Sequence, residues 1–218
     1  MLLRSMALTS GEGPSDGGPT VDGVVLPKSR LAAFSDGVFA IAITLLVLSL
    51  AVQSSQAHRL LDALSELWPA YLAYLTSFFM IGRVWMAHHL ILTVCKGIDR
   101  TAIKLNLILL FAVSFLPFPT SLLGQFVRDS GAERVAAVFY GVWLLLIAVL
   151  IAALWRYVSA DRRLLIERLP DVTVTRLTNA LEPSVALYGA AIVLALFLPQ
   201  VAAGAYLAIA VFGFIISA

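Results

Sequence analysis

Charged residues and cysteine are scarce in this sequence. Only 13% of its 218 residues are Asp, Glu, Lys or Arg, whereas soluble proteins carry about 25%. This shortage excludes an ordinary soluble domain. The one cysteine, Cys95, excludes an internal disulfide framework and a cysteine-based zinc cluster. The net charge of +2 predicts no nucleic-acid partner, because the basic residues lie in short segments between apolar runs, where membrane topology accounts for them.

Motifs for catalysis and metal binding are missing as well. There is no H-E-x-x-H sequence, no Gly-rich phosphate loop and no Ser-His-Asp pattern, so no common enzyme class is indicated. His88 and His89 are adjacent, and neighbours on a helix point about 100° apart, which prevents them from chelating one ion together. No Glu stands three or four residues away to complete a ligand set. We therefore expect no enzymatic activity, no cofactor and no metal site.

Hydrophobic residues make up 61% of the chain and occur in long runs. A run of about 20 apolar residues is long enough to cross a bilayer as a helix. The sequence therefore predicts an all-α membrane protein with six transmembrane helices per chain, at residues 30–52, 61–93, 101–124, 133–158, 179–198 and 201–217. Pro117 and Pro119 predict a kink near the end of the third helix, and Pro199 predicts a tight hairpin between the last two.

The regions outside these runs predict the domain organisation and the topology. Residues 1–27 are rich in Gly, Pro, Ser and Asp, which predicts a disordered N-terminal tail before a transmembrane domain at residues 28–218. Eleven Lys and Arg residues fall on the side of the N-terminus and three on the other side, leaving Arg83 within a helix. The positive-inside rule then places both termini in the cytoplasm, in a multi-pass cell-membrane protein surrounded by lipid.

The first predicted helix, "RLAAFSDGVFAIAITLLVLSL" at residues 30–50, has two different faces. On a helical wheel one stripe contains Phe34, Ile41, Thr44, Leu45 and Leu48, while Ser35 and Asp36 point away from it. By itself this apolar stripe favours ordinary helix packing. An ionised group inside a membrane protein needs partners, and the second and third predicted helices supply Arg83, Trp85, His88, His89 and Asn106. We therefore interpret Ser35 and Asp36 as structural links and not as ion ligands.

The same stretch resembles the R-x-x-x-F-S-D signature that opens the first helix of the transmembrane protein 175 potassium channels. Similar blocks follow in order: "RVWMAHH" at 83–89, "IDR" at 98–100 and "LNLILLFAVSFLPFPT" at 105–120. The resemblance covers about residues 28–124, and the remainder only by topology. It implies a leak-like, potassium-preferring cation channel. Because the F-S-D signature occurs once, the resemblance implies a homotetramer with a central pore lined by four copies of the first helix.

The resemblance also implies which residues form the pore. There is no TVGYG sequence, so the backbone-carbonyl filter of ordinary potassium channels is absent. The family pattern implies apolar rings at Ile41, Leu45 and Leu48, with a hydroxyl ring at Thr44. The first and last rings would lie about 10 Å apart and would gate potassium ions by width and dewetting. The implied structural polar network consists of Arg30, Phe34, Ser35, Asp36, Arg83, Trp85, His88, His89 and Asn106.

Two other classes of membrane protein fit parts of this pattern. A secondary transporter of a small cation or solute also places polar residues inside a helix bundle, although such proteins usually show internal repeats and broken helices. Neither feature is evident in the sequence, apart from the prolines at 117 and 119. A non-conducting assembly protein is the third class. Arg30 likewise has two interpretations, as a partner across subunits at the cytoplasmic mouth and as a positive-inside anchor.

Overall fold

The computed structural model describes residues 28–50, 60–162 and 164–217, and every regular element in these ranges is helical. The predicted N-terminal tail at 1–27 lies outside the described residues. The elements are α1 (Lys28–Leu45), a 3-10 turn (Leu46–Ser49), α2 (Leu60–Glu66), α3 (Trp68–Val94), α4 (Arg100–Phe115), α5 (Pro117–Phe126), α6 (Glu133–Ser159), a second 3-10 turn (Ala160–Arg162), α7 (Asp171–Phe197) and α8 (Pro199–Ser217).

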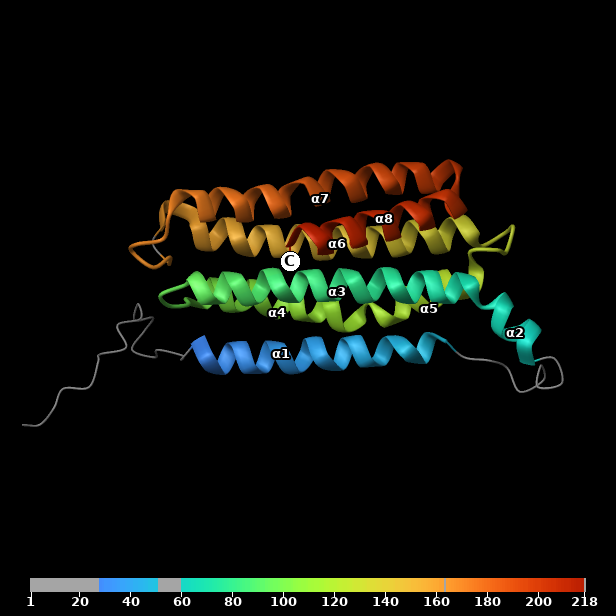
Figure 1. Ribbon diagram of the computed structural model, residues 1–218, viewed down its shortest axis with the longest axis horizontal. Helices are drawn as coiled ribbons and strands as arrows, with labels where there is room; N and C mark the ends of the chain where they lie inside the picture. Colours follow the sequence, from blue (N-terminus) through green and yellow to red (C-terminus); the bar gives the residue numbers. More distant parts are fainter. Residues whose placement is uncertain (1–27, 51–59, 163, 218) are drawn as a thin grey trace, which may run out of the picture.

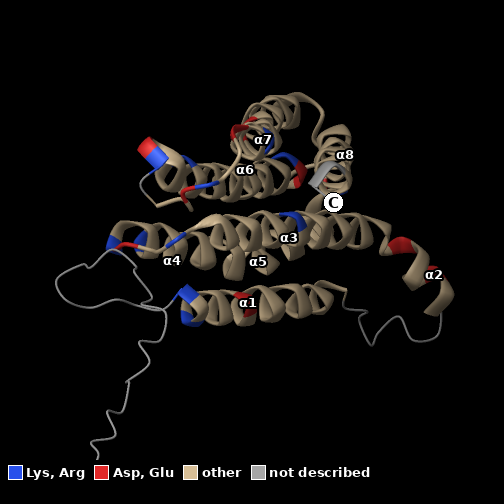
Figure 2. Cartoon of the chain, turned by 60° about the vertical axis from the view of Figure 1, so that its left-hand side comes forward, with Lys and Arg blue, Asp and Glu red and all other residues tan. Residues whose placement is uncertain are grey.

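The long helices run side by side along one axis (Figure 1). Helix α1 lies on one side of the bundle and packs against α3 and α4; α6, α7 and α8 lie on the other side, where α8 contacts both α3 and α7. Lys and Arg gather at the end of the bundle where α1 and α4 begin and α6 ends (Figure 2). The molecule is thus a multi-pass bundle with a basic end, and α1 is attached along one face only.

Proline residues break the helices where the sequence predicts it, and in one further place. Helix α4 ends at Phe115 and α5 begins at Pro117, which confirms the break in the third predicted helix. Helix α7 ends at Phe197 and α8 begins at Pro199, which confirms the hairpin. The prediction of a single helix at 61–93 was wrong, because α2 ends at Glu66 and a separate helix, α3, begins at Trp68. A proline lies in the first turn of α3, where the missing N–H is tolerated.

The start of α7 also differs from the prediction. The helix begins at Asp171 rather than at residue 179, and Pro183 lies inside it. Hydropathy detects only the apolar part of a helix, whereas residues 171–182 are polar turns that continue the same helix. Asp171 in the first turn stabilises this start by interacting with the positive end of the helix dipole.

Five of the described helical segments are long and apolar enough to cross a membrane, namely 28–49, 68–94, 100–126, 133–162 and 171–197. Helix α8 is also apolar, but the stretch of it at 199–215 is shorter than the other five segments. The chain is therefore an all-α, multi-pass membrane protein, and the sixth crossing stays a prediction.

Helix α6 supplies much of the interior of the bundle. Tyr140, Leu144, Ile147, Ile151 and Trp155 are all buried, at the spacing of three or four residues that places side chains on one face of a helix. This face lies against α7, α4 and α5. The interior is thus built mainly between the later helices, and one side of α1 has no partner among the described residues.

Candidate functional site

Helix α1 has a buried face and an exposed face. Ser35, Phe39, Ala42 and Leu46 are buried against the helices that contact α1, chiefly α3 and α4. Their spacing of four, three and four residues follows one side of a helix. The opposite side is exposed, including Phe34 (55%), Ile41 (61%), Leu45 (42%), Leu48 (71%), Thr44 and Arg30. The predicted pore stripe is therefore the face of α1 that no other part of the described chain covers.

The exposed stripe continues across a change in helix type. The α-helix ends at Leu45, and Leu48 lies in the 3-10 turn, which rises faster per residue than an α-helix. The separation of Ile41 and Leu48 along the helix axis is therefore about 12 Å, rather than the about 10 Å expected for a continuous α-helix. Both helix types return Leu48 to the side of Ile41, because three residues of a 3-10 helix complete one turn.

Thr44 lies on the exposed stripe with its hydroxyl donor already used. Its Oγ1 donates to the carbonyl of Ile41 at 2.9 Å, as hydroxyls in membrane helices commonly do. A hydroxyl oxygen also carries two acceptor lone pairs. The hydrogen bond leaves these lone pairs free on the exposed side of α1, where an oxygen can accept from water or coordinate a cation.

The buried face of α1 is joined to α3 and α4 by a chain of side-chain hydrogen bonds. Asn106 Nδ2 donates to Ser35 Oγ at 3.1 Å, and Asn106 Oδ1 lies 2.6 Å from His88 Nε2. All three side chains are buried. Because Asn106 donates through its nitrogen, its oxygen is the acceptor, which assigns the proton to His88 Nε2. His88 Nδ1 is buried with no hydrogen-bond partner among the described residues.

Asp36 is held by a separate contact at the edge of the same interface. Trp85 Nε1 donates to Asp36 Oδ1 at 2.8 Å, and the Trp85 ring lies 5.9 Å from the ring of His89. The ring of Phe39 lies 5.4 Å from that of His88. The structure therefore brings Ser35 and Asp36 together with Trp85, His88 and Asn106, all of which are candidate partners in the sequence.

Arg83 does not join this network, and this corrects the sequence interpretation. Its Nη2 donates to the Ala180 carbonyl and to Ser184 Oγ, both at 2.5 Å, on α7. Positions 83 and 85 are about 200° apart around a helix, so the side chains of Arg83 and Trp85 project from opposite sides of α3. A buried guanidinium must find acceptors, but the sequence does not reveal which helix lies on that side.

Phe34 and Arg30 also lie outside the network. Both are exposed on α1. Phe34 belongs to the exposed stripe by position. Neither of the two interpretations of Arg30 is decided within one chain, because no described residue is its hydrogen-bond or ion-pair partner.

Two polar links at the basic end of the bundle were missed by sequence reasoning. Lys28 Nζ donates to the Cys95 carbonyl at 2.8 Å, which attaches the start of α1 to the segment after α3. Asp99 caps α4 by accepting from the Ala102 N–H at 2.9 Å, and it also accepts from Tyr157 Oη at 2.6 Å. The signal for the cap was the "IDR" block, since an Asp directly before an apolar helix is a typical N-cap.

The same region contains the single cysteine, which is buried. Cys95 Sγ donates to the Ile91 carbonyl at 3.0 Å, and burial raises the pKa of the thiol to about 11. The thiol is therefore neutral near pH 7 and packs as a small apolar side chain. Within the described ranges, no cluster of three or more His, Cys, Asp or Glu side chains is arranged to hold a metal ion.

Known proteins resemble this chain in sequence. A family model described as "Endosomal/lysosomal potassium channel TMEM175" matches residues 30–117. A potassium channel of Streptomyces collinus is 39% identical over 157 residues, which are 71% of this chain and 76% of that protein. A potassium channel of Chamaesiphon minutus is 40% identical over 153 residues, or 69% of this chain and 75% of that one. An endosomal/lysosomal proton channel TMEM175 of Gallus gallus is 38% identical over 117 residues, but these are only 23% of that protein.

The fold has a solved counterpart as well. The crystal structure of a lysosomal potassium-selective channel TMEM175 homologue from Chamaesiphon minutus matches with a TM-score of 0.78 and 36% sequence identity. The match covers 87% of this chain and 97% of the other. The likeness therefore extends through the later helices, beyond the region matched by the family model.

Proposed function

Because the chain belongs to the TMEM175 family of ion channels, we propose that it is a leak-like, potassium-preferring cation channel whose pore is lined by four copies of α1. The relatives are ion channels and not enzymes, and the chain is likewise an ion channel without a catalytic role. Potassium is the permeant ion, and no cofactor is required. The preference for potassium is carried over from the bacterial relatives, which are named potassium channels.

The observation that carries this proposal is the uncovered apolar stripe of α1. Helix α1 buries one face against the chain, while Ile41, Leu45 and Leu48 face outward. One helix cannot enclose a pore, so this face of α1 can line a pore only together with other copies of the chain. Four copies arranged around an axis bring the three side chains into rings and Thr44 into a hydroxyl ring.

The rings explain gating and selectivity in the absence of a carbonyl filter. Apolar rings obstruct ions by dewetting a narrow passage. The Thr44 oxygen has free lone pairs toward the axis, so it can replace part of the hydration shell that an ion loses there. The Ser35–Asn106–His88 chain and the Asp36–Trp85 bond orient α1 so that the stripe faces the axis.

The proposal also includes six membrane crossings and cytoplasmic termini. Helix α8 supplies the sixth crossing by packing against α3 and α7. The basic residues at the end of the bundle where α1 begins (Figure 2) support a cytoplasmic location of that end, by the positive-inside rule. The expected location is the cell membrane.

Ion flux from liposomes tests the function directly. Purified protein should release potassium down its own gradient, with a reversal potential that follows the potassium gradient and with less flux of sodium and of a large organic cation. A secondary transporter is the second candidate, favoured by the break between α4 and α5 at Leu116. Saturable flux that requires an opposing gradient would replace the channel by the transporter.

Substitution of the first ring tests the pore wall. Ile41→Asn places four amides around the axis and wets the constriction, so we expect larger cation flux and weaker discrimination between potassium and sodium. The control is Ala40→Asn, which introduces the same amide at an exposed position about 100° away around the helix and should leave flux unchanged. Lower flux in Ile41→Asn without a gain for any cation would count against α1 as the pore wall.

A further inference from the structure

A groove between α3 and α7 has no role in the proposed pore. Its volume is about 270 Å³, and its lining includes Met86, Ala87 and Leu90 of α3 and Thr173, Arg176 and Ala180 of α7. The groove therefore lies on the side of α3 that faces α7, whereas α1 lies on the other side of the bundle (Figure 1).

The groove lies beside the polar first turns of α7, where we place the edge of the hydrocarbon core. Between Pro183 and Phe197 the helix has no charged residue, whereas residues 171–182 include Arg176 and Glu182. Thr173 and Arg176 precede Glu182, so they lie on the water side of this boundary. The polar zone of a bilayer extends several Å beyond the hydrocarbon core, and a helix rises about 1.5 Å per residue. The outer part of the groove is therefore at the depth of lipid headgroups, and its inner part, at Ala87 and Ala180, borders the acyl chains.

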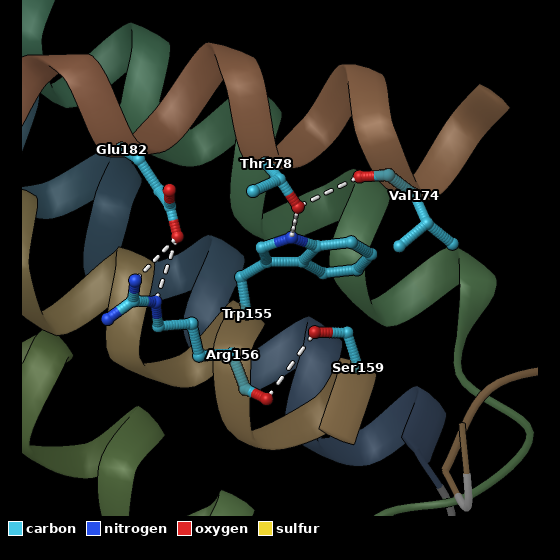
Figure 3. Close-up of polar contacts among 6 residues, drawn as sticks. All are labelled: Trp155, Arg156, Ser159, Val174, Thr178 and Glu182. Atoms are coloured by element: carbon cyan, nitrogen blue, oxygen red, sulfur yellow. Dashed lines mark hydrogen bonds and ion pairs between the residues drawn. The ribbon is translucent and has the colours of Figure 1, made fainter. Parts of the chain in front are cut away.

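Contacts between α6 and α7 mark the same boundary (Figure 3). Arg156 of α6 forms an ion pair of 2.9 Å with Glu182, and the neighbouring Trp155 donates through Nε1 to Thr178 Oγ1 at 2.9 Å. An ion pair with both side chains exposed fits the membrane interface better than the hydrocarbon core, where charged groups are costly. The ion pair also satisfies Glu182, so this carboxylate does not neutralise Arg176.

Two arginines make the groove electropositive, namely Arg176 in its lining and Arg83 in a neighbouring cavity. Arg176 is exposed and has no hydrogen-bond or ion-pair partner in the described part of the chain, and the same holds for the Thr173 hydroxyl. Behind the groove, Arg83 and Ser184 line a smaller cavity that shares Ala87 with it. Arg83 is buried and bonds only neutral acceptors among the described residues. No described residue of the groove lining is acidic.

We propose that this groove binds the headgroup of an anionic phospholipid. The phosphate oxygens accept hydrogen bonds from the Arg176 guanidinium and the Thr173 hydroxyl, and an acyl chain extends toward the apolar inner part beside Ala87 and Ala180. Basic sites between transmembrane helices at the cytoplasmic side suit anionic headgroups. The buried charge of Arg83 adds long-range attraction, because a charge in a low-dielectric interior is poorly screened.

Native mass spectrometry of the assembled protein tests this proposal without reference to ion conduction. The full chain is exchanged into detergent with equal amounts of phosphatidylglycerol and phosphatidylcholine, and the bound lipids are counted. We expect preferential retention of phosphatidylglycerol, and about a tenfold weaker retention in Arg176→Gln, since a charge-assisted hydrogen bond is lost. Thr173→Val, which keeps the shape but removes the hydroxyl, should weaken retention to a smaller extent.

Arg168→Gln is the matched control. Arg168 is an exposed arginine three residues before α7 that does not line the groove, so its loss should leave the retention of phosphatidylglycerol unchanged. Equal retention of the two lipids by the wild-type protein, or an equal effect of Arg168→Gln and Arg176→Gln, would overturn the proposal. Retention that appears only after deletion of residues 1–27 would also overturn it, because the groove would then hold a segment of the chain.

Discussion

At the scale of single residues, Asn106 links three helices. Its amide nitrogen reaches Ser35 of α1, its oxygen accepts from His88 of α3, and its own backbone belongs to α4. All these polar atoms are buried, so each depends on the others for its hydrogen bonds. The position of α1, and with it the exposed stripe, therefore depends on this one amide more than on the half-buried Asp36.

Replacing Asn106 by Leu should destabilise the protein. Leucine has a similar size but is apolar, so the substitution leaves Ser35 Oγ and His88 Nε2 without their hydrogen-bond partner. The expected cost in folding free energy is about 1–3 kcal/mol for each group. The measurement is thermal unfolding in detergent, followed by intrinsic fluorescence. Asn179→Leu, at an exposed position of α7, should shift the midpoint little. A normal midpoint for Asn106→Leu would show that the hydrogen bonds do not hold α1 in place.

Thr44 allows a second residue-scale test, this time of selectivity. Thr44→Val preserves the side-chain shape and removes the oxygen whose lone pairs face away from α1. We expect normal folding and a lower potassium-to-sodium permeability ratio in liposomes. Thr93→Val is the control, because the Thr93 hydroxyl also donates to a backbone carbonyl in an exposed position but lies on α3, outside the stripe. Unchanged ratios for Thr44→Val would remove Thr44 from the selectivity site.

At the scale of helices, the packing of α6 against α8 depends on a missing side chain. A Cβ atom at Gly141 would lie 2.6 Å from Tyr206 Cζ and 2.9 Å from Ile192 Cγ1. Tyr206 is buried and packs at 5.7 Å, ring to ring, against Tyr140. The tyrosine ring cannot retreat into free space, so Gly141 is required for the close approach of these helices.

Two glycine substitutions should therefore have opposite effects. Gly141→Ala forces α6 and α8 apart and should lower the unfolding temperature, by overpacking that typically costs about 1–3 kcal/mol. Gly189→Ala meets no atom within 4 Å and should raise it, because alanine favours a helix by up to about 1 kcal/mol over glycine. Fluorescence-detected unfolding of both variants measures the difference. A stable Gly141→Ala variant would contradict the packing described for α6 and α8.

At the scale of the whole molecule, the arrangement of the bundle determines which surfaces remain open. Helix α1 exposes Phe34, Ile41 and Leu48 along one side, and other helices also expose large apolar side chains, such as Phe111, Phe197 and Phe212. Exposed apolar faces of this kind in a membrane protein contact either lipid or another protein surface. The family relationship and the ring proposal favour other copies of α1, which makes the assembly state the decisive property of the molecule.

The intact protein should therefore be a tetramer in mild detergent. Light scattering combined with size-exclusion chromatography, after subtraction of the detergent, should give a mass of about four times the 23.5 kDa of one chain. The same preparation in denaturing detergent provides the single-chain reference. A monomer that still conducts ions would exclude the proposed architecture.

The sequence by itself determined the membrane class, the proline breaks at Pro117 and Pro199, and the two faces of α1. These properties depend on local composition and on the periodicity of one helix, which can be read from neighbouring residues. The boundaries of α2, α3 and α7 were beyond its reach, because hydropathy marks only the apolar part of a helix. It therefore missed both the polar first turns of α7 and the break at Leu67 between α2 and α3. The sequence also supplied the candidate polar partners, but without their pairing.

Only the tertiary structure decided those pairings. Arg83 bonds to α7 rather than to the network of α1, and Asn106 instead of Asp36 occupies the buried centre of that network. The physical reason is that a side chain on a helix has several possible neighbours, and the packing of distant segments selects one. The groove beside Arg176 follows from the same cause, since it exists only where α3 and α7, far apart in sequence, lie close together.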